Sequence, residues 1–104
     1  EEAGRLIGTN LLSANDEKAG EIENLVVDGT GRVRGAVVEW GGFLGLGQRS
    51  AVVPMEQIRF GADGRGHLGL ARDQLEALPR YERDKLAEIG RQQSLGDGLQ
   101  LLRN

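Results

Sequence analysis

The sequence of 104 residues contains no cysteine, only two prolines and 4% aromatic residues. The absence of cysteine excludes disulfide bonds, thiolate metal sites and a cysteine nucleophile. Because prolines are few and no low-complexity segment repeats, the chain is neither disordered nor collagen-like by composition. The length fits one domain with a short appendage, and the scarcity of aromatic residues predicts a mainly aliphatic core.

Three further absences restrict the function. No run of about 18 apolar residues is present, so we predict no transmembrane helix. The 13 basic residues are scattered along a chain of net charge −3, and the basic patch typical of nucleic-acid binders is missing. The sequence begins at Glu1 and not at methionine. We therefore expect that an upstream segment was removed: a signal peptide, a tag or a trimmed stretch of chain.

Glycine is abundant, with 17 residues, more than twice the average share of about 7%. Spread among runs of Val, Ile and Leu, it indicates many tight turns and hence many short strands. The strongest turn signals are the Asp-Gly pairs within residues 28–31 and 62–66, because these residues tolerate positive φ angles. The apolar runs predict strands over residues 6–12, 20–27, 33–40, 48–53, 56–60 and 67–70.

Short strands at spacings of about ten residues predict a small sandwich or barrel, since barrel closure hides strand edges. Pro54 cannot donate a ladder hydrogen bond, and it should end its strand or lie at an edge. The pattern then changes, because the leucines of residues 72–78 have helical spacing up to Pro79. A second, mostly exposed helix is predicted over residues 80–93. Residues 94–104 form a tail that is either disordered or docked on this domain or a neighbour.

Several short motifs occur in a fixed order along the chain. They are Leu6-Ile7-Gly8, residues 20–28, Gly41-Gly42-Phe43-Leu44-Gly45-Leu46-Gly47, Val52-Val53-Pro54 and residues 73–79. Together they resemble the PRC-barrel domain family over about residues 5–81, which leaves residues 82–104 as a charged helical extension and tail. The resemblance implies an all-β fold, a small SH3-like, partly closed antiparallel barrel of five to six short strands. A short C-terminal helical segment completes the expected fold.

The resemblance also implies a non-enzymatic role, because family members attach to other proteins and help to assemble complexes. The family includes the photosynthetic reaction centre H subunit and the C-terminal half of a ribosome maturation factor. The sequence shows neither the membrane segment of the first nor the RNA-processing domain of the second, so neither specific role transfers. It is most similar to short stand-alone bacterial members, many of them exported. We therefore expect the periplasm or cell envelope, with the cytoplasm as the alternative.

The glycine-rich segment 41–47 is the sharpest candidate site. It does not predict a phosphate loop, because Gln48 and Arg49 stand where lysine and Ser or Thr are required. It does not predict a dinucleotide site either, because a strand and not a helix follows. Two interpretations stay open: a hairpin loop that caps the barrel, or an exposed apolar docking patch. The predicted protein interface comprises Trp40, Gly41, Gly42, Phe43, Leu44, Gly45 and Leu46.

No set of residues predicts catalysis, a metal site or a cofactor. His67 is the only histidine, and without further ligands it is interpreted as a strand-end residue and not as a zinc ligand. The Asp-Gly turns lack the ligand run of a calcium loop, and no serine has a nucleophile-elbow context. The leading hypothesis is an interaction module that docks on a protein partner or forms a homodimer. The alternatives are an RNA-processing or ribosome-assembly accessory factor and a small-molecule carrier that uses the barrel mouth.

Overall fold

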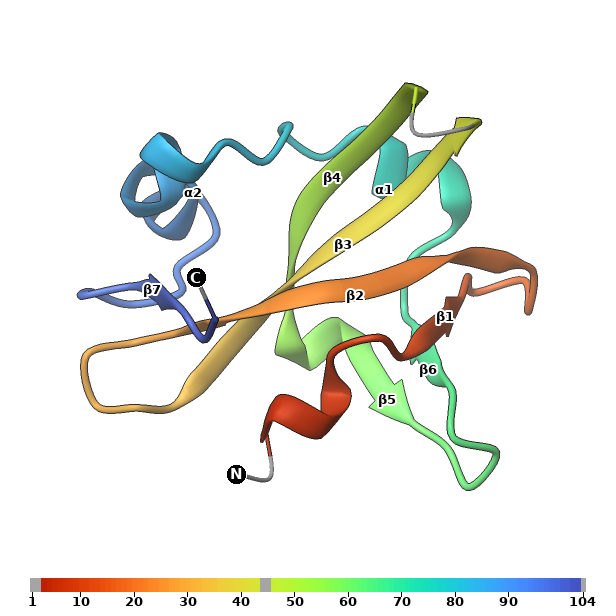
Figure 1. Ribbon diagram of the computed structural model, residues 1–104, viewed down its shortest axis with the longest axis horizontal. Helices are drawn as coiled ribbons and strands as arrows, with labels where there is room; N and C mark the ends of the chain where they lie inside the picture. The colour runs from red at the N-terminus through yellow and green to blue at the C-terminus, as the bar shows by residue number, and fades with distance from the viewer. Residues whose placement is uncertain (1–2, 44–45, 104) are drawn as a thin grey trace.

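The computed structural model describes residues 3–43 and 46–103. They form one curled sheet in the strand order β4-β3-β2-β1-β6-β5, and β7 pairs with β2 outside this path (Figure 1). The strands are β1 (Asn10–Leu12), β2 (Lys18–Val27), β3 (Val33–Phe43), β4 (Leu46–Pro54), β5 (Ile58–Phe60), β6 (Gly66–Leu68) and β7 (Gln100–Leu101). The helical segments are η1 (Ala3–Leu6), η2 (Met55–Gln57), α1 (Arg72–Glu76), η3 (Arg83–Lys85) and α2 (Leu86–Gln92). None of these described helices has the length and apolarity needed to cross a membrane.

The predicted small, partly closed barrel with a short C-terminal helical segment is confirmed, with two differences in the sheet. β4 and β5 stand at the two ends of the strand order. The first difference is that β1 and β6 are parallel, with Leu11 opposite Gly66. The long connection between them, which contains β2 to β5, allows the parallel direction. The second is a seventh strand, β7, which the tail contributes.

Two predicted boundaries are wrong for local reasons. The strand expected from Leu6 begins only at Asn10, because residues 3–6 form η1 and Gly8 has a positive φ of 94°. The strands on either side of the glycine-rich segment were expected to end at Trp40 and to begin at Gln48, but β3 continues to Phe43 and β4 begins at Leu46, which lies opposite Phe43. Pairing across the hairpin therefore outweighs the weak strand propensity of glycine.

Two layers of buried side chains pack on opposite faces of β2, β3 and β4. The first fills the barrel interior and consists of Leu11, Ala19, Ile22, Leu25, Ala36, Val38, Trp40, Ala51, Val53, Ile58, Leu68 and Leu75. The second covers the outer face and consists of Val26, Val37, Val52, Leu86, Ile89 and Leu95. The division follows from the strand period of two, since successive side chains point to opposite faces. The barrel interior is thus mainly aliphatic, as the composition predicts.

Residues 80–103, called here the C-terminal extension, form the cover of the outer face. The helix expected over residues 80–93 is shorter, and it is divided into η3 and α2. The tail is ordered against this domain: Leu101 lies opposite Val26, and the Leu102 N–H donates to the Leu25 carbonyl at 2.8 Å. Figure 1 shows α2 and β7 on the same side of the sheet. Of the alternatives left open for the tail, disorder or docking on this domain or a neighbour, the structure shows docking on this domain.

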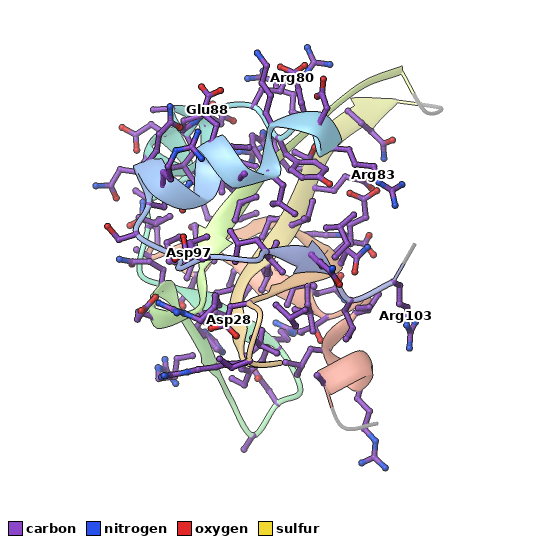
Figure 2. All side chains as sticks on the ribbon, turned by 90° about the vertical axis from the view of Figure 1, so that its left-hand side faces the viewer. Asp28, Arg80, Arg83, Glu88, Asp97 and Arg103 are labelled. Carbon is purple, nitrogen blue, oxygen red and sulfur yellow. The ribbon has the colours of Figure 1, made fainter. Side chains whose placement is uncertain are left out.

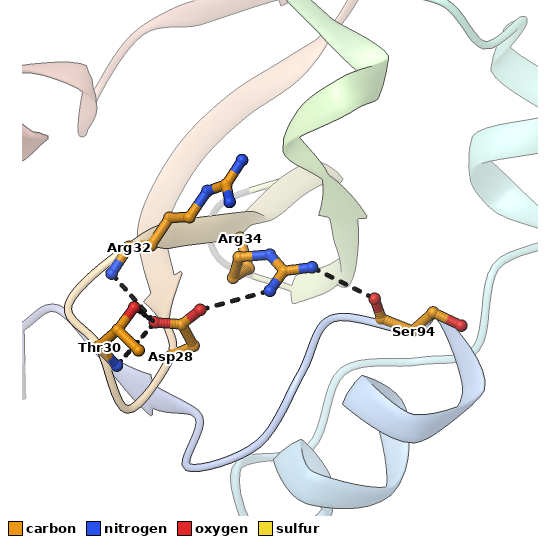
Figure 3. A network of polar contacts seen from close by, with 5 residues as sticks. All are labelled: Asp28, Thr30, Arg32, Arg34 and Ser94. Atoms are coloured by element: carbon orange, nitrogen blue, oxygen red, sulfur yellow. Dashed lines mark hydrogen bonds and ion pairs between the residues drawn. The ribbon is translucent and has the colours of Figure 1, made fainter.

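A polar network joins the turn between β2 and β3 to this extension (Figure 3). The Asp28 carboxylate accepts hydrogen bonds from the Thr30 hydroxyl at 2.6 Å, the Thr30 N–H at 2.9 Å and the Arg32 N–H at 3.1 Å. Its other oxygen pairs with Arg34 at 3.3 Å, and Arg34 also donates to the Ser94 carbonyl at 3.4 Å. These hydrogen bonds, that of the Thr30 hydroxyl first, hold the pKa of Asp28 well below its usual range.

Candidate functional site

The β3–β4 hairpin extends beyond the strands beside it. β2 pairs with β3 only as far as Glu21 opposite Glu39. Beyond that point β3 and β4 pair with each other alone, from Trp40 opposite Arg49 to the tip. Figure 1 shows the two strands projecting from the body of the molecule. We call residues 40–49 the projecting ribbon, and within the described chain both of its edges lack a neighbouring strand.

Gly20 sets the place where β2 leaves the ribbon. A Cβ atom at this position would lie 2.5 Å from the Glu39 carbonyl oxygen and 3.3 Å from the Trp40 Cβ. Such a separation is too short for a side chain, so only glycine allows β2 to pass this closely over β3. On its other edge, this first part of β2 pairs with β1, with Gly20 opposite Leu11 and Lys18 opposite Leu12.

The structure locates only part of the predicted interface. Trp40 is 7% exposed and belongs to the barrel core, which corrects the expectation that it is exposed with its neighbours. The reason is its inward position on β3, shared with Ala36 and Val38. Gly41 is exposed, and its φ is +74°. Leu44 and Gly45 lie outside the described residues, and for Gly42, Phe43 and Leu46 only the backbone is described. The docking role of this stretch therefore stays a prediction.

Two open cavities share Trp40 as a wall. The first, of about 350 Å³, lies between residues 18–21 and the residues Glu39 to Gly41. The second, of about 480 Å³, lies between residues 47–50 of β4 and the residues Glu76, Leu78 and Arg80. We call the second cavity the β4 groove.

One wall of the β4 groove is an open strand edge. The Ser50 carbonyl accepts a hydrogen bond from the Tyr81 N–H at 2.8 Å, and the Val52 carbonyl accepts one from the Gln93 side chain at 3.1 Å. Both carbonyls therefore point away from β3. Because backbone groups alternate along a strand, the Ser50 N–H and both backbone groups of Gln48 face the same outer edge. Pro54, four residues after Ser50, also has its backbone nitrogen on this outer edge, as expected for a residue without an N–H. Outside the β3–β4 ladder, from which these groups point away, no described residue forms a hydrogen bond with the backbone groups of Gln48 or with the Ser50 N–H.

The charges around the groove are predominantly positive and partly unpaired. Glu76 accepts a hydrogen bond from the Arg72 side chain at 3.3 Å, so its charge is compensated. Arg49 and Arg80 are exposed, and neither has an ion-pair partner among residues 3–43 and 46–103. Figure 2 shows Arg80 at the end of the molecule from which the ribbon projects. The groove thus offers two guanidinium groups to a ligand.

The first cavity, on the other side of the ribbon, is lined by two acidic and two basic side chains: Glu21, Glu39, Lys18 and Arg72. Glu21 lies across from Glu39, whose carboxylate accepts a hydrogen bond from the Gln48 side chain at 3.1 Å. Burial raises the pKa of Glu23 above its usual value, and the charge of Glu39 and a hydrogen bond with it raise this pKa further. Of these two cavities, the β4 groove is therefore the one lined by more basic than acidic side chains.

The other candidate residues do not form a second site. His67 lies on β6 beside the Asp63 turn, with its Nε2 3.5 Å from Asp63 and its Nδ1 4.0 Å from Asp16. This placement agrees with its interpretation as a strand-end histidine. In the described parts of the chain, no three His, Asp or Glu side chains are grouped closely enough to hold a metal ion.

The fold and its motifs are those of a known family. A family model of the PRC-barrel domain matches residues 1–64, more than half of the chain. The chain belongs to the PRC-barrel domain family. A PRC-barrel domain is a protein-interaction or assembly module, and the family is generally not catalytic. Nothing among the curated proteins matches this chain. The PRC-barrel match includes the projecting ribbon, whereas α1 and the C-terminal extension lie beyond it.

Sequence reasoning missed the β4 groove. Gln48, Ser50 and Arg80 form its walls, but β4 and residues 76–80 are far apart in the sequence, and no local pattern joins them. The one available signal was Pro54, which marks β4 as an edge strand. Pro54 indicates that β4 is an edge strand, but it does not indicate that residues 76–80 form the other wall of a groove.

Proposed function

We propose that this chain is a non-enzymatic interaction module that docks through its projecting ribbon on a protein partner or on a second copy. The observation that carries the proposal is the pairing of the ribbon, whose strands leave the sheet with both edges uncovered in the described chain. Exposed strand edges pair readily with other chains. A two-stranded hairpin alone is also marginally stable in water. A bound partner therefore stabilises the ribbon as well as being held by it.

The rest of the barrel surface offers little apolar area for docking. The outer-face valines Val26, Val37 and Val52 are covered by the C-terminal extension. Among the side chains that the structure describes, Phe60 is the one large exposed hydrophobic group, at 39% exposure. It lies on β5, at the opposite end of the strand order from β4. These facts favour the ribbon, with Phe43 opposite Leu46 near its tip, as the docking surface.

The test compares Phe43→Asp with Phe60→Asp, which places the same charge on β5. Light scattering after size exclusion, over a range of concentrations, measures self-association. Retention of an identified partner on the immobilised protein measures docking on another chain. We expect Phe43→Asp to weaken whichever association the wild type shows and Phe60→Asp to preserve it, with both variants folded by circular dichroism. A folded Phe43→Asp variant that keeps full association would overturn the assignment, as would a wild type that shows neither form of association.

A further inference from the structure

The β4 groove combines two features that recognise an extended peptide. One wall is the open edge of β4, where the Gln48 N–H and C=O and the Ser50 N–H face away from β3 and form no hydrogen bond with a described residue outside the β3–β4 ladder. The other wall carries Leu78 and the unpaired Arg80, while Arg49 reaches the groove from β4 itself. Extended peptides bind proteins in this way by adding a strand to an open sheet edge, with side-chain pockets for specificity.

We propose that the β4 groove binds an extended, acidic segment of a partner protein, which adds as a strand to the outer edge of β4. This inference rests on the proposed docking role of the ribbon and names the chemistry of its partner. The peptide backbone exchanges hydrogen bonds with Gln48 and Ser50. A carboxylate of the peptide pairs with the guanidinium groups of Arg49 and Arg80, a geometry that arginine favours for carboxylates.

The length of the open edge limits the bound segment. The Ser50 carbonyl is already occupied by the Tyr81 N–H, and the Val52 carbonyl by Gln93. Strand addition therefore extends from Leu46 to the Ser50 N–H and ends there. Because few main-chain hydrogen bonds fit in this span, the charge pair with the two arginines contributes much of the selectivity.

Charge also distinguishes a partner peptide from a second copy. A symmetric dimer through this edge would place β4 against the β4 of the other copy. Arg49 and Arg80 of both copies would then face one another, and neither has a described ion-pair partner to neutralise it. Like charges placed together across an interface oppose association. An acidic segment of another protein fits the same groove with opposite charge.

The experiment selects peptides from a displayed random library on the full chain. The affinity of each enriched, synthesised peptide is then measured through Trp40, the single tryptophan of the sequence and a wall of the groove. We expect the enriched peptides to combine Asp or Glu with strand-forming residues. Their affinity should fall at least tenfold in Arg80→Gln and stay unchanged in Arg91→Gln, an exposed arginine on α2.

Ser50→Pro tests strand addition itself. The substitution removes the Ser50 N–H, which points to the outer edge of β4 and not to β3. β4 tolerates a proline there for the same reason that it accommodates Pro54. Thermal unfolding verifies that the variant is folded. We expect this variant to lose the peptides. Enrichment of peptides without acidic residues, undiminished binding to Ser50→Pro, or no enrichment at all would each overturn the inference.

The remaining outcomes separate this inference from the proposed function. Peptides that Phe43→Asp loses but Ser50→Pro keeps would show docking through the ribbon tip without strand addition. A dimer that Ser50→Pro dissolves would make a second copy the occupant of the edge. Both results overturn the acidic-peptide inference and leave the docking role of the ribbon in place. Absence of both peptide binding and self-association overturns the two proposals together.

Discussion

Leu95 tests whether the C-terminal extension is an integral part of the domain. Its side chain is 1% exposed and packs in the layer that contains Val26, Val37 and Val52. Replacing a buried leucine by alanine costs about 2–5 kcal/mol, because apolar contact is lost and a cavity remains. We expect about 3 kcal/mol for Leu95→Ala, since the layer above β2–β4 is thin and can partly collapse. A domain of this size has a free energy of unfolding of about 5–15 kcal/mol, so the loss is large.

The same free energy predicts a fall in the unfolding midpoint of about 12 °C, at about 4 °C per kcal/mol. Urea unfolding should be followed with two probes: the fluorescence of Trp40 inside the barrel and the hydrogen exchange of the Leu102 amide, which bonds to β2. If the two layers unfold together, both probes should report the same loss in the free energy of unfolding. Phe60→Ala, at a 39% exposed site, is the control and should change stability by less than about 0.5 kcal/mol.

Two results would refute this reasoning about Leu95. One is a loss of less than about 1 kcal/mol, which would mean that the outer layer contributes little. The other is a loss confined to the Leu102 amide while the Trp40 transition stays unchanged. In that case the extension would open separately from the barrel.

Three further predictions concern Asp28 in the turn between β2 and β3, and Glu23 and Gly20 on β2. Asp28→Asn should lower the unfolding temperature at pH 7. The pKa of Asp28 is depressed in the folded state, so the stabilisation by its carboxylate is present above about pH 4 and is lost in acid. The unfolding temperatures of the variant and the wild type should therefore converge as the pH falls. The pKa of Glu23 is raised in the folded state instead, so the contribution of Glu23 to the free energy of unfolding falls as the pH rises through its folded-state pKa. Glu23→Gln should therefore be about 0.2–1 kcal/mol more stable than wild type at pH 7, with the gain absent at pH 4 in denaturant titrations. Gly20→Ala should destabilise by more than about 1 kcal/mol in the same assay, because its Cβ would meet the Glu39 carbonyl; an unchanged midpoint would contradict the crossing geometry.

The sequence predicted the parts of the fold that local chemistry determines. The Asp-Gly turn at residues 28–31 and the apolar runs on either side of it predicted the β2–β3 hairpin, and Pro54 predicted the end of β4. The alternation of side chains along a strand places Trp40 inward, two residues after Val38. Its place beside the glycine-rich segment led instead to the prediction that Trp40 is exposed in a docking patch. Regular cross-strand pairing, which a local pattern does not contain, decided the outcome.

The parts that sequence reasoning could not place depend on contacts between distant segments. Leu95 and Leu101 are ordinary leucines in a glycine-containing tail, and only the presence of Val26 and Val52 on the outer face explains their burial. The β4 groove similarly needs Arg80 and Ser50 side by side. Location in the cell envelope stays a prediction.

The pairing of β7 with β2 has a consequence for the order of folding. Val26 meets Leu101, so the two strands come from opposite ends of the described chain. Chains emerge from the ribosome N-terminus first, and contacts between distant residues form late. Strands β1 to β6 are all synthesised by Leu68, while the valine face of β2, β3 and β4 still lacks its cover. A nascent barrel therefore carries an apolar face, open to aggregation or to chaperones, until residues 86–101 arrive to cover it.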